Sequence, residues 1–194
     1  MPLTEKQIKD IAIEFKRNTL GSDDSSDMCY TISKPLSIHL KNICVENSIK
    51  YGQVQIVDDF GKNKDVDHFW IEVQTSFQID ATANQFNRKL NQNFDYVHFG
   101  KITKEIILSN EKELACNTIV PFIIPSFEKY IKLYFKAAII LLNDSKHVDD
   151  TTKYLGDICK ALENLKNSKK QDFDKLSTLV DTGKFLQLCK VRNI

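Results

Sequence analysis

The chain has 194 residues, of which 42% are hydrophobic and 27% are charged, and these values are typical of a folded globular protein rather than a disordered one. Its formal net charge is +1 at pH 7 and no basic run stands out, so composition gives no sign of a nucleic-acid-binding surface. The five cysteines form no Cys-x-x-Cys pair, which favours free thiols in a reducing compartment over a disulfide framework or a structural zinc site.

The first predicted element is an amphipathic helix close to the N-terminus. Thr4 and Gln7 have the spacing of a capping box, and Gly21 stands just beyond the expected end of the helix. The apolar face of this helix is made by residues at helical spacing: Ile8, Ile11, Ala12 and Phe15.

Cys29 lies at the predicted start of a second helix. A loop rich in Ser and Asp, residues 22–27, precedes it, and Ser26 or Asp27 is expected to cap the helix. The apolar positions that follow at near-helical spacing are Tyr30, Ile32, Leu36, Leu40 and Ile43. The N–H groups and dipole at a helix start favour a thiolate, so Cys29 is a candidate nucleophile. Pro35 predicts a kink or an early break in this helix.

The segment 67–86 reads as two strands joined by a tight turn. In the first strand Phe69, Ile71 and Val73 alternate with His68, Trp70 and Glu72, and in the second Phe77, Ile79 and Ala81 alternate with Gln78, Asp80 and Thr82. If the strands pair antiparallel, both apolar rows share one face only when odd-numbered residues oppose odd-numbered residues. His68 and Asp80 then share the other face within side-chain reach. The hairpin therefore predicts a His–Asp pair.

The remaining predicted elements also indicate an α+β protein. Further strands are expected at 53–57 and 96–99, with a polar connection at 58–67, and amphipathic helices are expected at 126–141, 149–165, 173–180 and 185–188. Helices followed by a small antiparallel sheet suit an α+β domain. We expect a core at 1–103 and a helical extension at 104–194 that packs on the core and carries no catalytic group.

The N-terminal residues are polar and charged, and they do not fit a secretory signal peptide. The longest apolar stretch, 134–142, is interrupted by Lys136 and is too short to span a bilayer. We therefore expect a cytoplasmic protein with no membrane partner, and export by a signal-independent route stays open.

Taken together, Cys29 at a helix start, His68-x-Trp70 opening a strand and Asp80-Ala-Thr on the next strand resemble the papain-like and transglutaminase-like cysteine enzyme superfamily. The likeness is greatest to the bacterial transglutaminase-like group, in which His-x-Trp-(Val/Ile)-Glu-(Val/Leu) is followed by Ile-Asp-(Ala/Pro)-Thr-Ala-x-Gln-Phe. It covers residues 29–100, and residues 68–86 carry most of its specificity. No upstream Gln stands out as a second oxyanion donor of the kind found in the papain branch.

The resemblance implies a papain-like or transglutaminase-like core with a catalytic triad and no cofactor. In that triad Cys29 is the nucleophile, His68 the general base and acid, and Asp80 the residue that orients His68. The expected activity is that of a thiol hydrolase or acyltransferase: a peptidase, amidase, deamidase or transglutaminase that acts on a protein, a peptide or a small amide. The alternative is a non-catalytic binding or regulatory module on the same fold. The oligomeric state is left open.

The other cysteines and histidines lack such a context. We interpret Cys44, Cys116, Cys159 and Cys189 as packing residues, and His39, His98 and His147 as structural or surface residues. Trp70 either shields the His–Asp contact and lines a cleft, or simply packs. A metal site made by Asp67, His68 and Asp80 is disfavoured because ligands on both faces of one strand rarely converge.

Overall fold

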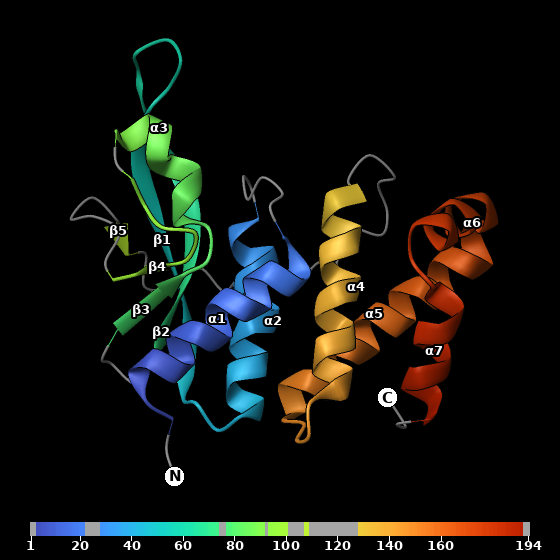
Figure 1. The fold of residues 1–194 in the computed structure, drawn as a ribbon. Coiled ribbons are helices and arrows are strands. Elements are labelled where there is room, and N and C mark those ends of the chain that lie inside the picture. Colours follow the sequence, from blue (N-terminus) through green and yellow to red (C-terminus); the bar gives the residue numbers. More distant parts are fainter. Residues whose placement is uncertain are drawn as a thin grey trace. The chain divides into compact units, whose positions relative to one another are not determined.

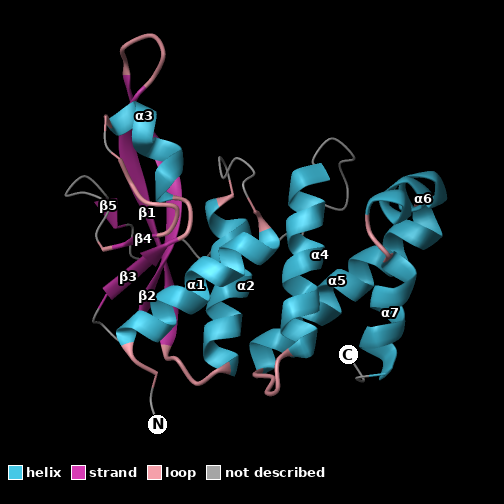
Figure 2. Cartoon of the chain, in the orientation of Figure 1, coloured by secondary structure: helices cyan, strands magenta, loops and turns pink. Residues whose placement is uncertain are grey.

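The structure is a computed structural model that describes residues 3–21, 28–73, 77–91, 93–100, 107–108 and 128–191. It has the α+β class that the sequence predicts, with helices and an antiparallel sheet (Figures 1 and 2). The chain divides into two compact units, residues 1–113 and residues 114–194. The sequence placed this boundary near residue 103, but residues 107–108 form a strand that pairs with the sheet of the first unit. The packing of the helical unit on the core stays a prediction.

The first unit contains all the strands that the structure describes. Its elements are α1 (Glu5–Thr19), α2 (Cys29–Asn42), β1 (Asn47–Val57), β2 (Asn63–Val73), β3 (Phe77–Asp80), the 3-10 helix η1 (Ala83–Phe86), α3 (Asn87–Leu90), β4 (His98–Phe99) and β5 (Ile107–Leu108). The strand order is β4-β3-β2-β1-β5, and every neighbouring pair is antiparallel. α1 contacts α2, and α2 contacts β1 and β2 (Figure 1).

The long hairpin of β1 and β2 extends beyond both strands expected from the sequence. It pairs from Asn47↔Val73 to Val57↔Asn63, so the polar residues 63–67 lie in a strand and not in a connection. In the turn, Asp58 Oδ1 accepts the N–H groups of Phe60 and Lys62 at 2.9 and 2.8 Å, and Gly61 has a φ of +76°. Backbone pairing continues where the side chains are exposed, which is why hydrophobic alternation alone gives too short a strand.

The register between β2 and β3 is the one the sequence requires. Ile71 lies opposite Ile79 and Val73 lies opposite Phe77, so odd-numbered residues oppose odd-numbered residues. β3 ends at Asp80, two residues before the expected end, and the chain turns at Ala81. The alternation in β2 indicates one buried face and one exposed face, but His68 and Trp70 on the other face are buried as well.

Residues after β3 bury that second face. Ala83, Phe86 and Phe94 from η1 and the segment after α3 pack there against Val54 and Ile56 of β1, with Val66 and Leu90 at the edge of the cluster. The sequence signal for a half-buried strand does not reveal such a cover, because the covering residues come from a short irregular segment with no clear periodicity.

Helices α1 and α2 differ in how they begin. Thr4 caps α1 through the predicted capping box with Gln7, in which Gln7 N–H donates to Thr4 Oγ1 at 3.3 Å. In α2 the N-cap position is Met28, whose side chain makes no capping hydrogen bond, and the expected caps Ser26 and Asp27 lie outside the described residues. α2 continues past Pro35 to Asn42, so the expected early break does not occur. Packing of the buried side chains of α2 stabilises the helix by more than the proline destabilises it.

The second unit is helical throughout its described part. It contains α4 (Glu128–Asn143), α5 (Asp149–Ser168), α6 (Lys170–Leu179) and α7 (Thr182–Val191), close to the four helices expected from the sequence. Phe135 of α4 and Phe185 of α7 pack with ring centroids 5.1 Å apart, and both side chains are buried. Gly183 lies in the first turn of α7.

Candidate active site

The structure brings His68 and Asp80 together. The register of β2 and β3, continued by one residue, places Asp80 opposite Trp70, so His68 lies on the diagonal of the same face. His68 Nε2 is 2.5 Å from Asp80 Oδ2, and both side chains are 0% exposed. The prediction that these two residues come within hydrogen-bond reach is confirmed.

Asp80 is held by its own backbone turn as well as by His68. Its other oxygen, Oδ1, accepts the backbone N–H of Thr82 at 2.8 Å and lies 3.4 Å from Thr82 Oγ1. A buried carboxylate needs such donors, because burial without them costs several kcal/mol. With Oδ1 held by Thr82, Oδ2 is fixed toward Nε2 of His68, and this sets the tautomer of the imidazole.

Cys29 is the first residue of α2 and is 9% exposed. Its thiol lies close enough to His68 to contribute both a hydrogen bond and a charge interaction to the protonation of the ring. Since Asp80 occupies Nε2, Nδ1 is the ring nitrogen left for the thiol. Nδ1 nevertheless has no hydrogen-bond partner among the described atoms, so the thiol and the ring do not form a full hydrogen bond. Such loose contacts are common in catalytic groups without substrate.

The electrostatics of the site favour an imidazolium. Burial by itself lowers the pKa of His68, but the charge and hydrogen bond of Asp80, with a smaller contribution from Cys29, raise the pKa from 6.5 to about 10. His68 therefore carries a proton at neutral pH. A protonated imidazole beside a thiol stabilises the thiolate form of that thiol.

Two aromatic rings flank His68. The ring of Phe86 meets it edge-on with centroids 4.9 Å apart, and the ring of Trp70 lies nearly parallel to it at 6.2 Å. Trp70 is 3% exposed, and its Nε1 has no partner among the described atoms. Trp70 thus packs beside the His–Asp pair and shields it, while one buried indole N–H is left to donate to a further group.

Lys16 of α1 is a charged residue that the sequence analysis missed. It is 0% exposed, and its Nζ donates to the carbonyl of Tyr96 at 2.5 Å and to Asn84 Oδ1 at 3.3 Å. Burial lowers the pKa of Lys16 from 10.5 to about 8, and the charge of Asp80 opposes that shift. The signal was present: Lys16 stands four residues after Ala12 and eight after Ile8, on the apolar face of the helix.

The other described cysteines differ in how exposed their side chains are. Cys44 is exposed, so its interpretation as a packing residue is wrong; it follows α2 at a φ of +64°, where the chain turns away from the helix. Cys189 is buried and Cys159 is half-buried, and their thiols interact, whereas Cys116 lies outside the described residues.

The alternative metal site would need Asp67 beside His68 and Asp80. Asp67 accepts hydrogen bonds from Tyr51 and Gln53 on the exposed side and does not join the His–Asp pair.

Two of the other histidines pack against aromatic rings, and the third, His147, is half-buried. His39 lies 5.3 Å from the ring of Phe15, and His98 lies 5.0 Å from the ring of Phe94. No cluster of three or more His, Cys, Asp or Glu residues suited to a metal ion occurs in the part of the chain that the structure describes.

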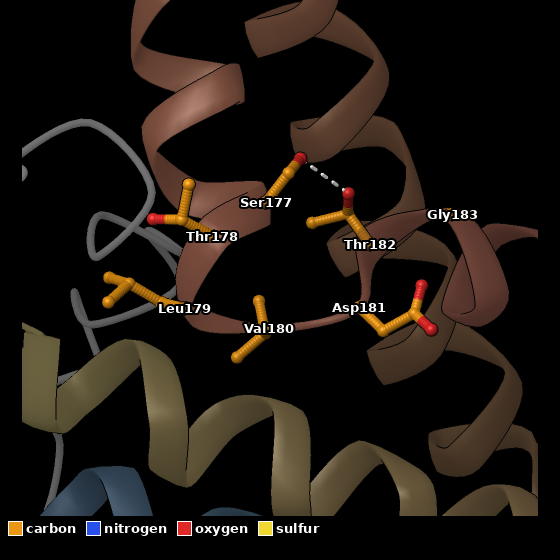
Figure 3. Close-up of a pocket in the computed structure, with 7 residues that line it drawn as sticks. All are labelled: Ser177, Thr178, Leu179, Val180, Asp181, Thr182 and Gly183. Carbon is orange, nitrogen blue, oxygen red and sulfur yellow. Dashed lines mark hydrogen bonds between the residues drawn. The ribbon is translucent and has the colours of Figure 1, made fainter.

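A hollow of about 270 Å³ lies in the helical unit, lined by residues 177–183 (Figure 3). Ser177 and Thr182 share a hydrogen bond of 2.7 Å there, and Asp181 Oδ1 accepts the backbone N–H of Lys184 at 2.8 Å. Because Asp181 already caps the start of α7 and places a negative charge beside the hollow, this site is a poorer candidate than the one at Cys29.

Comparisons with protein-family models, with curated proteins and with solved structures give no match to this chain. The likeness of residues 29–100 to the transglutaminase-like enzymes therefore rests on the motifs alone. Among the described residues, no helix combines the length and apolar character needed to cross a membrane.

Proposed function

We propose that the protein is a thiol enzyme that acts on amide bonds through Cys29, His68 and Asp80, on a papain-like or transglutaminase-like core. The observation that carries the proposal is the buried contact of 2.5 Å between His68 and Asp80, with Cys29 against the same imidazole. A nucleophile, a base and a residue that orients the base are the three parts of this chemistry.

The first chemical step is acyl transfer to the enzyme. The Cys29 thiolate forms a C–S bond with the substrate carbonyl carbon, and the carbonyl electron pair moves to oxygen. Cys29 opens α2, and the Met28 side chain at its N-cap makes no capping hydrogen bond, so the backbone N–H groups of this turn are suited to hold the developing oxyanion. When the oxyanion collapses, the C–N bond breaks and the proton on His68 passes to the leaving amine.

The second step releases the acyl group. Neutral His68 takes a proton from the acceptor as the acceptor attacks the thioester carbonyl, and the C–S bond breaks to return the thiolate. Water as the acceptor gives a peptidase, an amidase or a deamidase, and an amine gives a transglutaminase. Asp80 holds His68 by Nε2 so that Nδ1 exchanges the proton with both the leaving group and the acceptor.

Burial of the three residues supports a second candidate function. His68 and Asp80 are 0% exposed and Cys29 is 9% exposed, so a substrate carbonyl needs an approach to Cys29. A binding or regulatory module that keeps these residues only as a packed polar core needs no such approach. The retention of all three members of the triad favours the enzyme over the module.

The test is the intact mass of the protein after exposure to a panel of acyl electrophiles. The enzyme predicts one rapid adduct that is lost in Cys29→Ala and retained in Cys44→Ala, which removes an exposed thiol as the matched control. An adduct that forms faster on Cys44 than on Cys29 would support the module. Iodoacetamide at mildly acidic pH gives the same comparison with a smaller reagent.

A further inference from the structure

Lys16 lies in the core of the first unit without any salt-bridge partner at contact distance among the described residues. Its Nζ has two oxygen acceptors, Tyr96 O at 2.5 Å and Asn84 Oδ1 at 3.3 Å, and the ring of Tyr96 lies 4.1 Å away. These groups are neutral. A buried ammonium that only bridged neutral groups would lose more in hydration than it gains.

The charge that Lys16 faces is that of Asp80. Among the described residues, Asp80 is the charged group whose interaction with Lys16 favours the ammonium form against the effect of burial. The two groups that accept hydrogen bonds from Nζ belong to segments next to Asp80: Asn84 stands four residues after it, and Tyr96 stands two residues before His98, which pairs with Asp80 between β3 and β4. With a pKa of about 8, Lys16 is largely charged at pH 7.

We propose that Lys16 is a positioning residue of the candidate active site, whose ammonium balances the Asp80 carboxylate so that a Cys29 thiolate and a His68 imidazolium can exist together in the buried site. This inference rests on the proposed function. With Lys16, the four buried groups carry two positive and two negative charges. Without it, the site has a net charge of −1 whenever the thiolate is present, and a net buried charge is costly.

The inference distinguishes a charge role from a purely structural role. If Lys16 only holds α1 against η1 and the segment around Tyr96, its loss changes stability but leaves the ionisation of Cys29 as it was. If Lys16 balances the site, its loss moves the thiolate to higher pH, because the remaining negative charge of Asp80 is no longer offset.

The experiment measures the rate of iodoacetamide reaction at Cys29 from pH 5 to 9 in three variants of the full chain. Lys16→Met removes the charge and keeps most of the volume. Asn84→Asp is isosteric and sets a carboxylate against Nζ, which offsets the ammonium without removing the side chain. Lys6→Met makes the same charge change as the first variant at an exposed position of α1.

Lys16→Met and Asn84→Asp should each slow the reaction roughly threefold or more at pH 6 and shift the acidic limb upward, with rates that return toward wild type at pH 9. Lys6→Met should leave the curve unchanged. If Cys29 reacts fast in wild type, and the rate curves of Asn84→Asp and Lys16→Met both coincide with the wild-type curve, the role of Lys16 is overturned. The proposed function would still stand in that case. A slow wild-type thiol at every acidic pH would instead overturn the proposed function. If Lys16→Met fails to fold, Asn84→Asp decides the question alone.

Discussion

Replacing Asp80 by Asn tests whether the buried carboxylate is what keeps His68 protonated. The change is best made in Cys29→Ala, since ionisation of the thiol would otherwise add its own pH dependence. In the folded state the pKa of His68 is about 10, and its ordinary value is 6.5. Between these two values the folded state holds a proton that the unfolded state has released, so stability falls as the pH rises.

The size of the effect follows from the width of that window. From pH 6.5 to pH 8, a range of about 1.5 units at 1.36 kcal/mol each, Cys29→Ala should lose about 2 kcal/mol of unfolding free energy through His68. Measurement stops at pH 8 because Lys16, with a pKa of about 8 when folded, gives the opposite slope above that value. In Cys29→Ala with Asp80→Asn, burial keeps His68 neutral and this loss should vanish.

The assay is urea unfolding followed by tryptophan fluorescence. Trp70 is the only tryptophan of the chain and lies beside His68, so the signal reports on the first unit. At pH 6.5 the Asp80→Asn protein should also be less stable by about 3–5 kcal/mol, the usual cost of removing one partner from a buried ion pair. Equal slopes against pH in the two proteins would refute the account of His68.

Three smaller perturbations test the parts around the site. Phe86→Ala should lower the unfolding free energy by about 3–5 kcal/mol, because the buried ring packs on His68, and a loss below 1 kcal/mol in the same urea assay would show that the cover contributes little. Phe185→Ala should destabilise the helical unit, as judged by circular dichroism, while iodoacetamide still reacts with Cys29 at the wild-type rate; a folded variant with a slow Cys29 would contradict the division of roles. Thr4→Ala should cost about 1 kcal/mol by removing the cap of α1, and an unchanged thermal midpoint would argue against the capping box.

The contact between His68 and Asp80 could be predicted because the strand pair has only two alternatives: its apolar row faces either the core or water. A strand that buries one row of apolar side chains fixes its register, and the register decides which polar residues share a face. The apolar row of Phe69, Ile71 and Val73 was long enough to make that choice unambiguous. The start of α2 near Cys29 was predictable for a similar reason, since apolar spacing begins directly after a polar loop.

The burial of the site could not be predicted from the same patterns. The cover over His68 depends on Phe86 and Phe94, which come from a 3-10 turn and an irregular segment, and their positions are set by tertiary packing. The first half of β2 could not be predicted as a strand for the same reason, because backbone pairing with β1 extends the strand through polar residues. The apolar pattern of α1 does not by itself point to Lys16, although a charge at a core position is itself informative.

The most direct test of the central claim is the pH dependence of iodoacetamide reaction at Cys29 in wild type, His68→Ala and Asp80→Ala. Cys44, which is exposed, provides an internal reference in the same sample. The account predicts that wild-type Cys29 reacts fast at acidic pH values where Cys44 is nearly inert, that His68→Ala moves the curve to that of Cys44, and that Asp80→Ala gives a smaller shift. A wild-type curve superimposable on that of His68→Ala would mean that Cys29 and His68 are not coupled, and this would contradict the proposed enzyme.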